Sequence, residues 1–207
     1  MTGDNTELPR KPATTQVPIH DLLAARWSPR AFDATRAVTR EQIIALIEAA
    51  RWAPSCFGNE PWRFLMWDRA VDDAGWQRAF ACLSAGNQPW VKNVPLLFAA
   101  IAHPTFDHNG KPNRWAQYDT GAASENLVLQ AAALGLAAHQ MGGFDVDRLR
   151  AEFAIPEECT PMAMIAVGHQ ASPDVLAEEQ RVKELAQRAR KLRATRFFAG
   201  RWGIPLE

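Results

Sequence analysis

Cysteine is scarce in this chain of 207 residues, and its charges cancel. Cys56, Cys82 and Cys159 are an odd number without C-x-x-C spacing, which argues against a disulfide framework and against a zinc site. Lys plus Arg and Asp plus Glu number 23 each, so no net field draws the chain to nucleic acid or to an anionic membrane. We therefore expect no nucleic-acid partner, no bound metal and a reducing, cytoplasmic location.

Long apolar runs and glycine-rich phosphate loops are also missing. The longest apolar stretch, residues 94–102, has about half the length that a membrane-spanning helix needs, so no membrane partner is expected. The first twenty residues carry charges and prolines without an apolar run, so they do not resemble a signal peptide, and we interpret residues 1–18 as a flexible arm. No G-x-G-x-x-G or Walker loop occurs, so a nucleotide cofactor would bind without the usual phosphate loop.

The remaining composition is that of an ordinary globular protein. Hydrophobic residues make up 47% and charged residues 22% of the chain, close to the averages for soluble domains. A chain of this length fits one domain and buries roughly 70% of its unfolded surface on folding. We predict a single domain over residues 19–207.

The clearest element is a helix over residues 39–52. Thr39 and Gln42 match a capping box, and Pro54 ends the pattern. Four apolar residues follow at helical spacing on one face, namely Ile43, Leu46, Ile47 and Ala50.

Helices and short apolar strands alternate along the rest of the chain. Buried strands are predicted at residues 63–67, 95–102 and 161–168. A long helix is predicted at residues 118–136, ended by Gly135, with His139 and Gln140 at its end, and helical propensity returns at residues 175–192. The long helix has a small-residue surface made by Ala122, Ala123, Ala131, Ala132 and Ala133. This alternation favours an α/β or α+β fold.

Two stretches carry candidate binding chemistry. Residues 26–30 place two guanidinium groups and a hydroxyl close together, and such a group can grip a phosphate with roughly 1.5–3 kcal/mol per charge-assisted bond. Residues 53–62 form a small, polar and prolyl loop in which Trp62 offers an apolar anchor for a planar ligand. Solvated arginines at a helix end and an ordinary helix-to-strand turn remain the alternatives.

Taken together, these stretches resemble the nitroreductase family. Its members open with an arginine, serine and basic pattern, here residues 26–30, and later carry a Pro-Ser-Ser-x-Asn-x-Gln-Pro-Trp loop, here residues 54–62. The resemblance continues, in the family's order, at residues 86–87, 119–127, 134–136, 141–144, 166–168 and 200–203.

The resemblance implies an α+β fold around a mostly antiparallel sheet, in an intertwined homodimer with FMN at the subunit interface. It implies an oxidoreductase that passes hydride from NAD(P)H through flavin N5 to an electron-poor acceptor, such as a nitroaromatic or a quinone, by a ping-pong mechanism. The flavin carries the chemistry, so no side chain is expected as a catalytic nucleophile. Nitroreductase-like relatives with flavin-fragmenting or with peptide or enone dehydrogenase chemistry, and a non-catalytic FMN-binding protein, remain alternatives.

The resemblance also implies which residues bind the flavin. Arg26 and Ser28 would contact the phosphate and ribityl chain, and Arg30 would lie beside the pyrimidine edge. Ser55 and Cys56 would reach the flavin from the partner subunit. The full implied set is Arg26, Trp27, Ser28, Arg30, Pro54, Ser55, Cys56, Asn59, Asn87, Gly142, Gly143, Arg188 and Arg190.

Asn87 resembles an asparagine that contacts the flavin ring, and Gly142 and Gly143 match a loop that faces flavin N5. Arg188 and Arg190 resemble a basic pair that closes over the phosphate. The long alanine-rich helix and the apolar tail of residues 197–202 would then supply a dimer interface, with the tail wrapping the partner.

The chain departs from the family loop at two positions. Gly58 stands where an asparagine is usual, and Asn59 compensates by a shift of one residue. Glu60 stands where a glutamine is usual and would add a carboxylate near the mouth of the pocket. His139 could serve as a proton donor or as a packing residue, and the sequence leaves both open.

Overall fold

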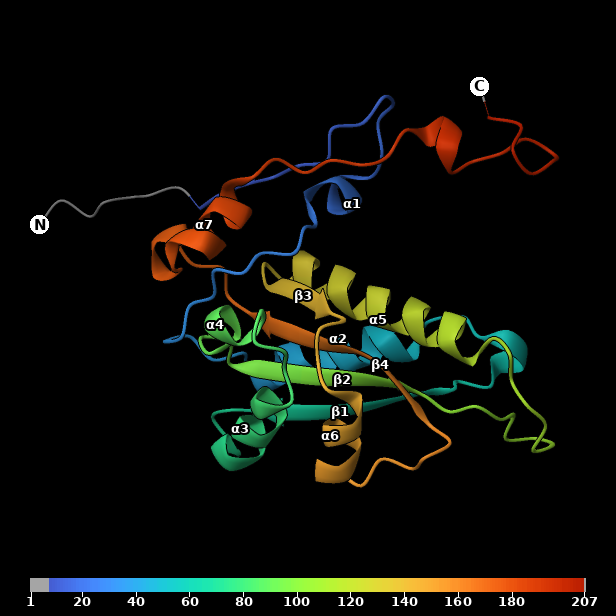
Figure 1. Ribbon diagram of the computed structural model, residues 1–207, viewed down its shortest axis with the longest axis horizontal. Coiled ribbons are helices and arrows are strands. Elements are labelled where there is room, and N and C mark those ends of the chain that lie inside the picture. Colours follow the sequence, from blue (N-terminus) through green and yellow to red (C-terminus); the bar gives the residue numbers. More distant parts are fainter. Residues whose placement is uncertain (1–7, 207) are drawn as a thin grey trace, which may run out of the picture.

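The computed structural model describes residues 8–206, which fold into a sheet covered by helices on both faces (Figure 1). In chain order the elements are α1 (Asp21–Ala25), α2 (Arg40–Arg51), η1 (Cys56–Gly58), β1 (Trp62–Asp68), α3 (Asp73–Ala81), α4 (Gln88–Val91), β2 (Leu96–Ala102), α5 (Ala116–Ala133), β3 (Ala137–Met141), α6 (Val146–Glu152), β4 (Thr160–Gly168), η2 (Pro173–Val175), α7 (Glu178–Leu185) and η3 (Arg193–Thr195).

The four strands lie in the order β1-β2-β4-β3, and every neighbouring pair is antiparallel. The expected α+β fold with a mostly antiparallel sheet is therefore confirmed. All three predicted strands are present within one or two residues of their predicted ends.

Two hydrophobic layers sandwich the central strand β2, which is buried along its whole length. Successive side chains of a strand point to opposite faces, and here Phe98 packs with α2 and α5 while Leu97 and Ala99 pack with the α3 side. This double burial explains the unbroken apolar run of residues 96–102, because neither face of the strand meets water.

Helix α2 confirms the capping-box prediction. The Thr39 hydroxyl accepts the backbone N–H of Gln42, and the Gln42 side chain accepts the backbone N–H of Thr39. Ile43, Leu46 and Ala50 are buried. Ile47 was expected on the same face but is 44% exposed, so the apolar face that the subunit itself covers is narrower than predicted.

Helix α5 ends three residues earlier than predicted, at Ala133. Gly135 has φ +71, a conformation that glycine adopts without steric cost, and it turns the chain into β3. His139 and Gln140 therefore lie on strand β3, and their placement at a helix end was wrong. The strong helical pattern before them concealed a strand of five residues.

The small-residue surface of α5 is used partly inside the subunit. Ala123 and Ala131 are fully buried in the same hydrophobic cluster as Leu46 of α2. Small side chains at these positions allow the two helices to approach closely. These two alanines are therefore not available to a partner subunit, so they cannot be part of the dimer interface that this helix was expected to supply.

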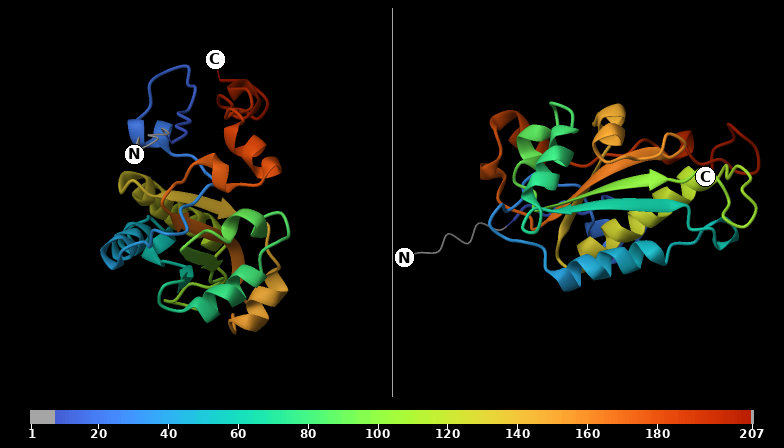
Figure 2. Two further views of the ribbon diagram at one scale, coloured as in Figure 1. Left: turned by 90° about the vertical axis from the view of Figure 1, so that its left-hand side faces the viewer. Right: turned by 90° about the horizontal axis from the view of Figure 1, so that it is seen from below.

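The C-terminal part of the chain is less helical than predicted. Helix α7 covers only Glu178–Leu185 of the predicted residues 175–192. After it, the described chain contains the short 3-10 helix η3 but no further α-helix, and it runs along the side of the molecule where α1 and residues 8–18 also lie (Figures 1 and 2). Residues 8–18 contain no helix or strand, and residues 1–7 of the predicted arm lie outside the described residues.

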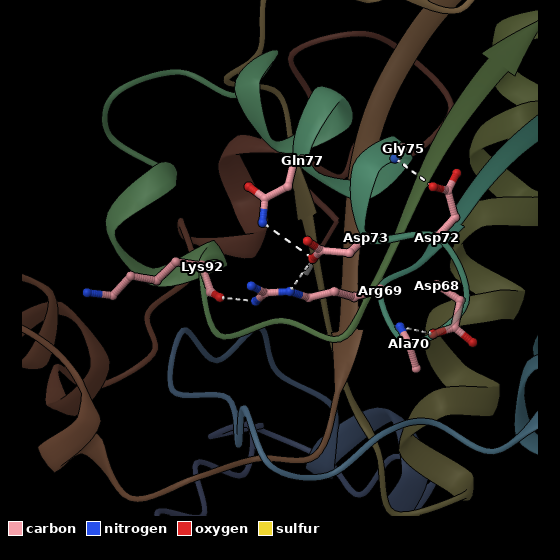
Figure 3. Close-up of polar contacts among 8 residues, drawn as sticks. All are labelled: Asp68, Arg69, Ala70, Asp72, Asp73, Gly75, Gln77 and Lys92. Atoms are coloured by element: carbon pink, nitrogen blue, oxygen red, sulfur yellow. Dashed lines mark hydrogen bonds and ion pairs between the residues drawn. The ribbon is translucent and has the colours of Figure 1, made fainter.

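A polar turn joins β1 to α3 and anchors the helices on that face of the sheet (Figure 3). Asp68 accepts the backbone N–H of Ala70, and Asp72 caps α3 through the N–H of Gly75. Arg69 bonds both the Asp73 carboxylate and the backbone carbonyl of Lys92, which follows α4. The turn thereby fixes α4 and the preceding Asn87 region against the core.

Candidate functional site

A cavity of about 240 Å³ gathers the basic residues that the sequence singled out at opposite ends of the chain. Its lining residues are Lys11, Arg26, Trp27, Ser28, Arg30, Lys183, Ala186, Gln187, Arg188 and Arg190. Six of these belong to the set implied by the family resemblance. No acidic side chain of the described residues lines the cavity, so it presents an electropositive surface to a ligand.

Contacts from α5 and β3 shape the residue 26–30 segment. The Arg26 guanidinium lies 3.6 Å from the Glu125 carboxylate on α5, and its Nη1 is 3.4 Å from the Ser28 hydroxyl. On the other side, the His139 ring donates from Nδ1 to the backbone carbonyl of Pro29 at 2.9 Å. The segment is thus held between two elements of the core.

His139 behaves as a packing residue in this arrangement. Its ring lies 4.7 Å from the Trp90 ring, between centroids. Burial lowers the pKa of His139 to about 4, so the imidazole is neutral at pH 7. A neutral ring whose Nδ1–H is engaged with a backbone carbonyl fits the packing alternative better than the proton-donor alternative.

Glu184 is a residue that sequence reasoning missed. Its side chain is fully buried, and its two carboxylate oxygens accept the backbone N–H groups of Arg30 at 2.8 Å and Ala31 at 3.2 Å. Burial raises the pKa of the Glu184 carboxyl above its usual value. In the sequence Glu184 looks like the exposed acids of the same helix, and only the tertiary contact with residues 30–31 distinguishes it.

Lys11 and Arg188 close the cavity from two further segments. The Lys11 ammonium donates to the backbone carbonyl of Glu184 at 2.6 Å and lies 4.4 Å above the centroid of the Trp27 ring. The Arg188 guanidinium donates to the backbone carbonyls of Lys11 and Ala24. Residues 8–18 therefore contribute to the site, and no sequence signal pointed to Lys11.

The second implied group, residues 54–59, forms a tight loop anchored to the start of α5. The backbone N–H of Cys56 donates to the buried Asp119 carboxylate at 3.0 Å, and the Ser55 hydroxyl accepts the backbone N–H of Glu60. Gly58 has φ +63. Glycine and asparagine are the residues that tolerate this conformation, which gives a physical reason for the departure from the family loop.

Asn59 does not line the basic cavity. Its side-chain amide donates to the Thr105 carbonyl at 3.3 Å, and its carbonyl oxygen accepts the Asp107 N–H at 2.8 Å. The side chain is 9% exposed. It ties the loop of residues 54–59 to the loop that follows β2, so both polar ends of its amide already have protein partners.

The third implied group brings Asn87 and Gly143 together. The Asn87 side-chain amide donates to the Gly143 carbonyl at 2.9 Å, and the Ser84 backbone N–H donates to the same oxygen. A Cβ atom at Gly143 would lie 2.7 Å from the Ser84 hydroxyl, whereas one at Gly142 would meet open space. Glycine at position 143 permits this close approach.

A single chain leaves these groups apart. The basic cavity is lined by none of Ser55, Cys56, Asn87 or Gly143 among the described residues. Cys56 contacts Asp119 and Arg26 contacts Glu125, and these two positions on α5 are separated by about 9 Å of helix rise.

Comparison with known proteins decides the family. The model of the nitroreductase family matches residues 23–169, which is more than half of the chain. The chain belongs to the nitroreductase family. Among solved structures, it is similar to an oxidoreductase containing FMN, with 34% identity, a TM-score of 0.83 and coverage of 91% of this chain and 95% of that one.

Two curated relatives extend this likeness. An uncharacterised 15.4 kDa protein of Mycolicibacterium smegmatis is 40% identical over 95 residues, which is 45% of this chain and 63% of that protein. The oxygen-insensitive NAD(P)H nitroreductase of Salmonella typhimurium is 23% identical over 189 residues, covering 72% of this chain and 87% of that enzyme.

Within residues 8–206, no helix is both long and apolar enough to cross a membrane. Over the same part of the chain, no three His, Cys, Asp or Glu side chains are grouped so that they could hold a metal ion.

Proposed function

We propose that this nitroreductase-family member is an FMN-dependent oxidoreductase that passes hydride from NAD(P)H to an electron-poor acceptor such as a nitroaromatic or a quinone. The observation that carries the proposal is the basic cavity, because it is built from family-matched residues at 26–30 and closed by Arg188 and Arg190. The similar oxidoreductase that contains FMN supports the choice of cofactor.

The donor set of the cavity fits the phosphate group of FMN. Guanidinium groups bind phosphate through paired, charge-assisted N–H bonds, and Arg26, Arg188 and Arg190 line the cavity together with the Ser28 hydroxyl. A phosphate monoester is close to doubly charged at neutral pH, so it suits a cavity without acidic lining. Riboflavin lacks this group and would lose the main part of the interaction.

Bound FMN would supply the hydride chemistry, and the chain would supply binding, orientation and electrostatics. Arg30 would provide a fixed positive charge, which stabilises the negative charge that a reduced flavin carries. Asn87 and Gly143 would form a rigid rim, because the hydrogen bond between them holds the loop in place. The neutral His139 would keep the Pro29 carbonyl, and so the Arg30 backbone, in position.

The complete site would require a second copy of the chain. Residues 54–59 lie apart from the basic cavity in one subunit, and large apolar side chains near them are exposed, including Trp52 at 75%, Phe57 at 82% and Tyr118 at 79%. A two-fold dimer would bury these side chains and bring Ser55 and Cys56 to the partner's flavin. Such an obligate interface should bury more than about 2,000 Å² in total.

The direct test of the proposed function is the cofactor itself. We expect the purified protein to be yellow, with about one FMN released per chain on denaturation, and its absorbance to bleach anaerobically with NADH or NADPH and recover when a quinone is added. A colourless protein that refuses added FMN would overturn the proposal. Bound FMN that neither nicotinamide reduces would favour a storage or sensing role.

A further inference from the structure

The basic cavity gathers several positive charges, and only some of them are paired with carboxylates of the described residues. Arg26 pairs with Glu125, and Lys183 pairs with Glu179. Within residues 8–206, the charged groups of Lys11, Arg30, Arg188 and Arg190 form no ion pair with a carboxylate. Like charges gathered in a partly buried cavity repel one another, so a negative charge nearby would stabilise the cavity.

Glu184 is a buried carboxylate next to the cavity that can supply this negative charge. It lies behind the cavity wall, not on it, and its two oxygens receive the N–H groups of Arg30 and Ala31. The charges of Lys11 and Arg30 act to keep Glu184 ionised, and the charge of Glu184 acts to keep Lys11 protonated. The pKa of Lys11 is nevertheless lowered, first by burial and further by Arg30 and Arg188.

Glu184 also occupies the point at which three distant segments meet. Its carboxylate holds residues 30–31, its backbone carbonyl accepts Lys11, and its helix α7 leads directly into Arg188. The Arg188 guanidinium then returns to the Lys11 carbonyl. Because these contacts converge on one residue, the placement of Arg30 and Arg188 relative to each other depends on it.

We propose that Glu184 is the internal counter-ion of the basic cavity and a positioning residue for Arg30 and Arg188. Its fixed negative charge balances the cavity when no ligand is bound, and a bound phosphate group takes over part of that balance. The inference rests on the proposed role of the cavity as a phosphate site. It adds a residue that does not line the cavity and that the family resemblance does not mark.

The first test compares the thermal stability of the flavin-free protein in chloride and in inorganic phosphate at constant ionic strength. In chloride, Glu184→Gln should lower Tm by about 5–10 °C, because the variant leaves the cavity cations without a balancing charge and replaces one of the two oxygens that accept backbone N–H groups by an amide donor. Phosphate should raise the Tm of the variant about twice as much as that of the wild type, because the anion replaces the missing charge. Equal or smaller phosphate shifts in the variant would overturn the counter-ion role.

The matched control is Glu178→Gln, on the exposed side of the same helix. Glu178 pairs with Arg181, which does not line the cavity. This variant removes the same charge from α7 and should keep both the wild-type Tm in chloride and the wild-type phosphate shift. A matching increase in the phosphate shift of Glu178→Gln would show that net charge, and not the position of Glu184, controls the response.

A second measurement needs no ligand and separates charge balance from hydrogen bonding. Removing the cavity cation that acts most strongly on Glu184, in the double variant Glu184→Gln/Lys11→Gln, should recover about half of the lost Tm, because one unbalanced charge has been deleted and glutamine can still donate to the Glu184 carbonyl. If Glu184 acted through its hydrogen bonds alone, the double variant would be no more stable than Glu184→Gln. Failure of both variants to fold would count against the counter-ion role in the same way.

These arms also separate the inference from the proposed function. A wild-type protein whose Tm ignores phosphate and that binds no FMN would contradict the phosphate site. The comparison of the double variant with Glu184→Gln would still show whether Glu184 balances the cations. A wild type that responds to phosphate, with Glu184→Gln responding equally, would contradict only the role of Glu184.

Discussion

At the scale of single residues, charge and protonation set the properties of the site. Arg26 contributes a guanidinium to the cavity, and its partner Glu125 is half exposed, so this ion pair adds little stability and leaves Arg26 available to a ligand. His139 lies behind it as a neutral, largely buried ring. Substitution of Arg26 is therefore expected to change ligand affinity, whereas substitution of His139 is expected to change stability.

For Arg26→Ala we expect FMN to bind about ten- to a hundred-fold more weakly, as follows from losing a charge-assisted contact of roughly 1.5–3 kcal/mol. Fluorescence titration of the flavin-free protein with FMN would measure this. Arg78→Ala is a suitable control, because Arg78 is 55% exposed on α3 and does not line the cavity. Unchanged FMN affinity in Arg26→Ala would remove Arg26 from the site.

The lowered pKa of His139 should make the free energy of unfolding depend on pH. The pKa of His139 is about 4 in the folded protein, whereas the ordinary value is 6.5. Between pH 6.5 and pH 4, the imidazole therefore binds a proton in the unfolded state but not in the folded state. Stability is retained above pH 6.5 and is lost progressively toward pH 4. From pH 7 to pH 5 the loss attributable to His139 is about 2 kcal/mol.

Urea unfolding of the wild type and His139→Gln at both pH values would measure this term. Glutamine can donate to the Pro29 carbonyl but does not titrate, so the variant should lose about 2 kcal/mol less than the wild type between pH 7 and pH 5. Identical pH dependence in the two proteins would show that His139 titrates normally.

At the scale of elements, the connections between helices and strands matter more than the helices themselves. The loop after β3 approaches the start of α4 so closely that a Cβ atom at position 143 would displace the Ser84 hydroxyl and the Asn87 side-chain amide. Its neighbour Gly142 faces open space. The pair therefore offers a matched comparison in which the same substitution is made at adjacent positions.

Gly143→Ala should distort the Asn87 contact, because the new methyl group would meet the Ser84 hydroxyl at 2.7 Å and the Asn87 side-chain amide at 2.9 Å. We expect FMN affinity to fall by about ten-fold and Tm to fall by a few degrees, as is usual when a small residue is overpacked. Gly142→Ala should leave Tm within about 2 °C of the wild type. Equal effects of the two substitutions on Tm and FMN affinity would contradict the role of close packing at position 143.

At the scale of the whole molecule, the C-terminal segment extends away from its own core. Phe197 is 59% exposed and Trp202 is 88% exposed. Among the described residues, the backbone N–H groups of 195–206 that form hydrogen bonds donate to carbonyls of residues 192–204 only, so the segment makes no backbone pairing with the sheet. An exposed apolar segment of this kind suits a partner surface.

If the proposed dimer forms, truncation after Arg193 should dissociate it and release FMN at the same time. Light scattering with absorbance detection would report mass and bound FMN in one experiment. We expect aggregation, or a monomer with little flavin, because residues 54–59 of the partner would no longer complete the site. A soluble monomer that keeps its full FMN would show that one chain builds the site.

Local features whose causes lie within a few residues could be predicted from the amino-acid sequence. The capping box at Thr39 and Gln42 placed the start of α2, and apolar runs placed β1, β2 and β4, since capping and burial patterns are written in neighbouring side chains. The ordered motifs also indicated the family, and the family model and a similar solved structure confirm it.

Which distant residues share the candidate site depends on the folding of the whole chain. Lys11 and Glu184 are separated by 173 positions, and Glu184 lies 154 positions from Arg30, so no local pattern could pair them. Strand β3 and the shortened α7 were also decided by packing, because their local propensities were helical. A charge in an extended chain is solvated wherever it stands, and only folding determines whether it becomes a surface ion or a buried counter-ion.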